Sequence, residues 1–427
     1  MKNKFIKSTL ILLIGGLITK ALGMVIKIIM ARLLGSKILG IYMLILPTFT
    51  LLISLSSFSF PIALSKLISE EKRNNKKLVF SILPVLIIIN ILLIILIVLL
   101  SPIISNKLLH NKDTYISILS MSLVIPFTSI SSICRSYFFG KQNMFPHVLS
   151  NIIEDIVRLI IIVIGIPIIK PLGTKYIVCF LILINIISEI VSTIVLVFFL
   201  PKNIKIKKED LHPNKSYIKD SLKICIPNTT SKLIGCIGFF LEPIILTNVL
   251  LKYFDIKYII REYGVITGYV IPLILLPSFF TLALSQSILP VISKYSSINN
   301  IKGIKRKTNQ VILLSILIGL PVTIILLVKG DLLLHLIYHT NEGINYLRIL
   351  APICLLQYIE SPLSSILDAL NKSKDNLIST ILGTITRTIS LIVFSKKGIY
   401  SLIISISLNI LITTFYQIKK VRYYLTH

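Results

Sequence analysis

The chain is dominated by long apolar runs that short polar connections separate, and this pattern limits what it can fold into. A helix that crosses a lipid bilayer needs about 20 mostly apolar residues in a row. Several such runs follow one another along the 427 residues. We expect twelve spans, at 8–31, 39–62, 78–100, 115–139, 148–169, 176–200, 221–250, 264–291, 310–328, 346–370, 377–394 and 399–418. The last two are short, and together they could instead be one helical hairpin.

Composition agrees with a membrane protein and excludes other classes. Hydrophobic residues make up 55% of the chain and charged residues 15%, whereas a soluble domain carries about 25% charged residues. The five cysteines lie in apolar runs without the spacing of a metal site or a redox pair, so we expect free thiols. The sequence has no G-x-x-x-x-G-K-[ST] motif for a nucleotide, and its connections are too short for a catalytic domain. We therefore expect an all-helical integral membrane protein that is not an enzyme and uses no cofactor.

The positive charge of the chain follows its topology. The net charge is +28, but the basic residues lie mostly in the short connections and form no patch with interleaved aromatic residues. Connections on one side of the membrane hold roughly twice as many Lys and Arg residues as those on the other. We expect both termini on the cytoplasmic side of a bacterial cytoplasmic membrane, and no nucleic-acid partner.

Weak similarities recur in the two halves of the chain in the same order. The segment 56–61 resembles 285–290, and Arg158 and Arg387 occupy equivalent positions. Paired halves are how many transporters place a site near the middle of the bilayer. We expect an N-terminal six-helix lobe at 1–200, a cytoplasmic linker at 201–220 and a C-terminal six-helix lobe at 221–427, around a central cavity.

Six basic residues lie inside the expected spans, where each would cost about 2.5–3.5 kcal/mol on the lipid-facing centre of a helix. They are Lys20, Lys27, Arg135, Arg158, Lys232 and Arg387. Ion pairs between the lobes could explain any one of them. An anionic ligand explains the set better, because the first two spans contain no carboxylate.

The first span carries the clearest pair. Lys20 and Lys27 are seven residues apart, so they share a helix face on which Gly23 lies between them. Small residues beside two cations suit the wall of a narrow aqueous cavity, although either lysine could instead reach a lipid headgroup. Arg32 could be a headgroup anchor or a residue at the rim of the cavity.

Acidic residues inside the spans fall into two groups. Glu154 and Arg158 stand at i and i+4, a spacing at which the two charges can pair within one helix. Three further carboxylates are candidates for ion coupling or gating, namely Glu189, Glu242 and Glu360.

Several segments carry a family resemblance. They are 19–23 (TKALG), 31–35 (ARLLG), 61–67 (PIALSKL), 135–144 (RSYFFGKQNM) and 263–268 (YGVITG). The chain resembles the stage V sporulation protein B family of the multidrug/oligosaccharidyl-lipid/polysaccharide exporter superfamily, to which lipid II flippases are related. The resemblance implies two six-helix lobes that form a V, and transport of polyprenyl-linked saccharide precursors. It also implies that Lys20 and Lys27 meet the substrate diphosphate.

Two features depart from these relatives. Lipid II flippases often carry an arginine in the second span, where this chain has leucines at 51–52, so lipid II itself is in doubt as the substrate. Members commonly have fourteen spans, whose last two contribute a groove for the lipid tail, and about twelve are expected here.

The favoured hypothesis is a flippase for a polyprenyl-diphosphate-linked saccharide, which serves peptidoglycan or polysaccharide synthesis, including sporulation. Its partners would be this substrate, membrane lipids and enzymes of cell-wall or spore-envelope synthesis. The candidate ligands are basic, because cations bind a diphosphate well: Lys20, Lys27, Arg32, Arg135, Arg158 and Lys232. A drug–cation antiporter of the same superfamily would require acidic residues in its cavity. A membrane scaffold for cell-wall enzymes, without transport, is the third hypothesis.

Overall fold

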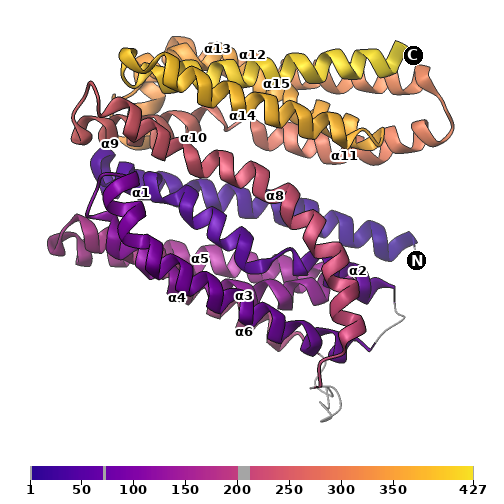
Figure 1. The fold of residues 1–427 in the computed structure, drawn as a ribbon. Coiled ribbons are helices and arrows are strands. Elements are labelled where there is room, and N and C mark those ends of the chain that lie inside the picture. The colour runs from indigo at the N-terminus through magenta and orange to yellow at the C-terminus, as the bar shows by residue number, and fades with distance from the viewer. Residues whose placement is uncertain (1, 71–73, 201–211, 427) are drawn as a thin grey trace. The chain divides into compact units, whose positions relative to one another are not determined.

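Helices make up all the regular structure in the part of the chain that the computed structural model describes, residues 2–70, 74–200 and 212–426 (Figure 1). A helix satisfies its backbone hydrogen bonds internally, which a segment in a bilayer requires. The expected all-helical membrane fold is therefore confirmed.

The chain divides into two compact units, Met1–Pro243 and Ile244–His427, with the division inside α8. The expected linker at 201–220 lies partly outside the described residues, and the expected lobe boundaries stay a prediction. The elements of the first unit are α1 (Lys2–Ser57), α2 (Phe60–Ser69), α3 (Asn75–Ile103), η1 (Ile104–Leu108), α4 (Thr114–Gly140), α5 (Met144–Ile169), η2 (Lys170–Leu172), α6 (Thr174–Phe198) and most of α8 (Lys215–Leu250).

The second unit begins near the end of α8 and contains the remaining helices. They are α9 (Ile256–Val265), η3 (Ile266–Val270), α10 (Ile271–Ile274), α11 (Ser278–Ser297), α12 (Ile301–Tyr338), α13 (Ile344–Ala369), α14 (Ser373–Val393), η4 (Ser395–Lys397) and α15 (Tyr400–Thr426). The last two expected spans are the two helices α14 and α15, with η4 between them.

Helix α1 consists of two arms. Gly35 lies between them with φ 70° and ψ 169°, a backbone conformation outside the helical region that glycine adopts without steric cost. Figure 1 shows the chain reversing its direction in α1. The arms correspond to the first two expected spans, and they bring residues on either side of Gly35 to one pocket.

One expected span is bent. The apolar run expected at 264–291 is split into Ile256–Ile274 and Ser278–Ser297, which meet at an angle of 55°. Pro277 precedes the second piece, and proline cannot donate the backbone hydrogen bond that would continue a helix. The run therefore forms two helical pieces that meet at a bend, rather than a single straight helix.

By length and composition, nine helices in the described part of the chain could cross a membrane, or up to ten with the bent pair. Two observations account for the difference from the twelve expected spans. Helix α1 counts once, although Gly35 separates it into two arms. Helix α5 is not among the nine because it carries three charged residues, Glu154, Asp155 and Arg158, in its apolar stretch. Its length of 26 residues is still sufficient to span a bilayer.

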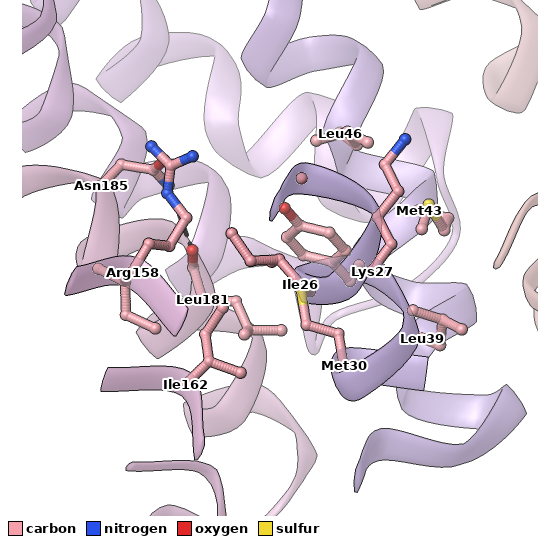
Figure 2. Close-up of a pocket in the computed structure, with 13 residues that line it drawn as sticks. Ile26, Lys27, Met30, Leu39, Met43, Leu46, Arg158, Ile162, Leu181 and Asn185 are labelled. Atoms are coloured by element: carbon pink, nitrogen blue, oxygen red, sulfur yellow. Dashed lines mark hydrogen bonds between the residues drawn. The ribbon is translucent and has the colours of Figure 1, made fainter. Parts of the chain in front are cut away.

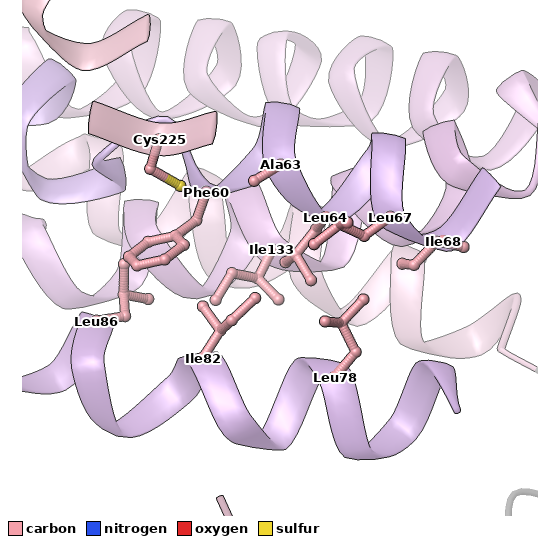
Figure 3. Packing of buried hydrophobic residues seen from close by; sticks show 10 residues of the cluster. All are labelled: Phe60, Ala63, Leu64, Leu67, Ile68, Leu78, Ile82, Leu86, Ile133 and Cys225. Carbon is pink, nitrogen blue, oxygen red and sulfur yellow. The ribbon is translucent and has the colours of Figure 1, made fainter. Parts of the chain in front are cut away.

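A packed hydrophobic core joins α2, α3 and α8. Helix α2 buries Phe60 and Leu64 against Leu78 and Ile82 of α3, and Cys225 of α8 joins them (Figure 3). Cys225 and the other four cysteines are free, as expected. This core holds α2 and α3 against α4, the helix that carries Arg135.

Candidate functional site

A pocket of about 230 Å³ lies within the first unit. Its walls come from both arms of α1, from α5 and from α6 (Figure 2). The lining residues are Gly23, Ile26, Lys27, Met30, Leu39, Tyr42, Met43, Leu46, Arg158, Ile162, Leu181, Ile184 and Asn185. Two of them are basic and none is acidic, so the charged groups that reach the surface of the pocket are cations.

The two cations come from elements far apart in the sequence. Lys27 belongs to the first arm of α1 and Arg158 to α5, and Figure 2 shows them on opposite sides of the pocket. The side chain of Lys27 is exposed to the space around it. Because an ammonium and a guanidinium offer several N–H donors, the pair can hold a phosphate or diphosphate from two sides.

The rest of the wall is mostly apolar. Met30, Leu39, Ile162 and Leu181 line the pocket together with the two cations. Gly23 leaves open space, since a Cβ built there would meet no atom within 4 Å. An apolar wall excludes water and thereby strengthens the attraction between the cations and a bound anion.

Arg158 is also part of a network of charges between α4, α5 and α6. Its Nη2 lies 2.5 Å from Oε1 of Glu154, which confirms the expected i, i+4 pair, and its Nη1 lies 3.2 Å from Oδ1 of Asp155. Oε2 of Glu154 accepts a hydrogen bond from Nη2 of Arg135 at 2.5 Å. The same Nη2 of Arg135 lies 2.9 Å from Oε2 of Glu189. The network joins three helices.

The other expected site residues lie outside this pocket lining. Lys20 is half-buried on the first arm of α1, and Arg32 is exposed three residues before Gly35. Lys232 is exposed on α8. Their roles as ligands, like those of Lys27, Arg135 and Arg158, stay predictions.

The three carboxylates expected to take part in ion coupling lie on three different helices. Glu189 of α6 pairs with Arg135. Glu242 is buried on α8, and Glu360 is half-buried on α13 of the second unit. The structure thus connects one of the three, Glu189, to the network that reaches the pocket.

Sequence reasoning missed two polar residues of the pocket. Tyr42 lies on the second arm of α1 and Asn185 on α6. Asn185 stands one turn before Glu189, and this spacing on a polar helix face was the available signal. Tyr42 had no such signal, because its position beside Arg158 depends on the reversal of the chain at Gly35.

Comparison with known proteins identifies the family. Residues 5–296 match the family described as polysaccharide biosynthesis protein, and residues 243–393 match the MatE family. Stage V sporulation protein B of Bacillus subtilis (strain 168) is 29% identical over 398 residues, which are 91% of this chain and 77% of that protein.

Solved structures show the same fold. Lipid II flippase MurJ in an inward closed conformation aligns with a TM-score of 0.73 at 17% identity, over 96% of this chain and 87% of that one. An inward-facing multidrug resistance MATE family transporter of the MOP superfamily aligns with a TM-score of 0.74 at 16% identity, over 96% and 94%. The chain belongs to the polysaccharide biosynthesis protein family, as a multi-pass membrane transporter with the fold of the MOP superfamily.

Proposed function

We propose that this protein moves a polyprenyl-diphosphate-linked saccharide across the bacterial cytoplasmic membrane by alternating access, for peptidoglycan or polysaccharide synthesis. The observation that carries the proposal is the pocket that Lys27 and Arg158 line from opposite sides, without an acidic residue in the lining. We place both termini in the cytoplasm, in agreement with the distribution of basic residues.

The size of the pocket indicates which part of such a substrate it would hold. Its 230 Å³ is below the range of about 300–1,000 Å³ that is typical of sites for drug-sized ligands. A diphosphate fits this description better than a whole oligosaccharide. The prenyl tail would stay in the lipid, and movement of the headgroup would require no covalent chemistry.

The fold does not separate this function from drug export, because a multidrug transporter and a lipid II flippase align about equally well. The residues that line the pocket favour the lipid-linked saccharide. A transporter for cationic drugs needs carboxylates to balance the charge of its cargo. The residues that line this pocket supply two cations instead.

Replacement of Lys27 by alanine is expected to weaken binding of a short-chain prenyl-diphosphate N-acetylglucosamine about 10- to 100-fold. The reason is that a hydrogen bond to a charged group contributes about 1.5–3 kcal/mol, and 1.4 kcal/mol is a factor of ten. Isothermal titration calorimetry on the protein in detergent micelles measures this change.

Lys37→Ala is the matched control, because Lys37 is an exposed lysine of the same helix outside the pocket. Its affinity should equal that of the wild type. Equal loss in both variants, or tighter binding of a cationic dye than of the diphosphate, would contradict the proposed function.

A further inference from the structure

A continuous line of ion pairs leads from the pocket to a buried carboxylate. Arg158 lines the pocket and also holds Oε1 of Glu154. The other oxygen of Glu154 holds Arg135, and Nη2 of Arg135 reaches both Glu189 and the hydroxyl of Ser192, each at 2.9 Å. Whatever occupies the pocket therefore acts, through Arg158, on the charge balance around Glu189.

The network contains more acid than base. Glu154, Asp155 and Glu189 face the two guanidiniums of Arg135 and Arg158. The side chains of Glu154 and Glu189 are 9% and 11% exposed, so water screens them little. If the three carboxylates bound one proton, their remaining two negative charges would equal the two positive charges of the arginines.

The side chains of the network differ in exposure, and the most exposed one lies at the pocket. Arg158 has the most exposed side chain of the network, at 25%. Within this network, the buried Nε atoms of Arg135 and Arg158 have no hydrogen-bond partner among the described residues. A network in which donors are unused can rearrange at a smaller cost than one in which every group is satisfied.

We infer that binding of an anion in the pocket is coupled to uptake of one proton by this network, with Glu189 as the proton acceptor. An anion that pairs with Arg158 competes with Glu154 and Asp155 for its charge. Arg135 then has to balance Glu154, with which it already makes its shorter contact, and Glu189 loses its counter-charge. A proton bound to the Glu189 carboxylate removes the resulting excess of negative charge.

Other titratable groups lie near the network, so the test has to distinguish them from Glu189. Helix α4 adds Cys134 beside Arg135, α5 adds His147, and α1 adds Tyr42 and Lys27. The ring of His147 lies 4.5 Å from that of Phe139 and near the side-chain amide of Asn151. His147 is the one of these four groups whose ordinary titration range lies closest to neutrality, so it is the natural competitor of Glu189.

The inference rests on the proposed function and adds to it a coupling between the binding of the anion and the uptake of a proton. By linkage, an anion whose binding takes up a proton binds more tightly as the pH falls. The change in affinity approaches about tenfold per pH unit when one proton is taken up.

Calorimetry in two buffers of different ionisation enthalpy counts the protons taken up with the ligand. The probe is the prenyl-diphosphate N-acetylglucosamine, because both of its phosphates stay ionised near neutral pH. The wild type should take up about one proton per ligand bound. Glu189→Gln, which keeps a hydrogen-bond acceptor for Arg135, should bind the probe with no uptake, and His147→Gln should behave like the wild type.

Three results would each overturn part or all of the inference. Binding by the wild type without proton uptake would overturn the coupling and leave the proposed function in place. Loss of uptake in His147→Gln together with normal uptake in Glu189→Gln would overturn the role of Glu189. No binding by folded wild-type protein would overturn both the proposed function and this inference.

Discussion

Replacing Glu154 by alanine is expected to lower the free energy of unfolding by about 3–5 kcal/mol, which is typical when one partner of a buried ion pair is removed. Glu154 binds Arg135 with one oxygen and Arg158 with the other, and its side chain is 9% exposed. Without it, two guanidiniums on neighbouring helices lose a shared counter-charge. The loss should be measured by denaturant unfolding in detergent micelles, with a spectroscopic signal from the first unit.

An exposed ion pair of the second unit provides the control. Glu342 lies 2.5 Å from Arg261, but their side chains are 34% and 55% exposed. Glu342→Ala should therefore cost only about 0–1 kcal/mol, as exposed pairs do. If Glu154→Ala cost no more than Glu342→Ala, the network between α4, α5 and α6 would not stabilise the first unit.

Replacing Gly23 by leucine is expected to reduce transport to the background rate without destabilising the protein. A Cβ built at Gly23 meets no atom within 4 Å, so a side chain there has room to enter the pocket that Gly23 lines. There it would take up part of the space that a bound headgroup needs. Leucine also favours the helical backbone over glycine by up to about 1 kcal/mol, so the fold should be at least as stable.

Gly16→Leu tests whether any loss comes from the pocket. Gly16 lies on the same arm of α1, also faces open space, and is outside the pocket lining. Both variants are reconstituted in liposomes, and transbilayer movement of a polyprenyl-diphosphate saccharide is measured. Gly16→Leu should transport like the wild type. Normal transport by Gly23→Leu would show that the pocket is not on the substrate's path.

The fold could be predicted largely because the bilayer imposes a simple pattern on sequence. Runs of about 20 apolar residues gave the helices, and Gly35 separates α1 at the connection expected between the first two runs. The bend of 55° before Ser278 could not be predicted. Proline in a membrane helix permits a kink, but the packing of neighbouring helices decides how large it is.

The candidate site could be predicted only in part, for a similar reason. Local spacing identified the pair of Glu154 and Arg158, because residues four apart meet on any helix. The bond from Arg135 to Glu189 joins residues 54 apart in the chain, and only the packing of α4 on α6 brings them together. Lys20 shares a helix face with Lys27, yet it is not among the residues that line the pocket.

A cation at position 27 should be needed to carry a diphosphate headgroup through this protein. We would measure enzyme-accessible transbilayer movement of a polyprenyl-diphosphate saccharide in liposomes that contain the wild type, Lys27→Ala or Lys27→Arg. We expect movement by the wild type, its loss in Lys27→Ala and partial recovery in Lys27→Arg, because arginine restores the charge with a different geometry. Movement by Lys27→Ala at the wild-type rate, or no movement by folded wild-type protein, would show that Lys27 does not carry the headgroup.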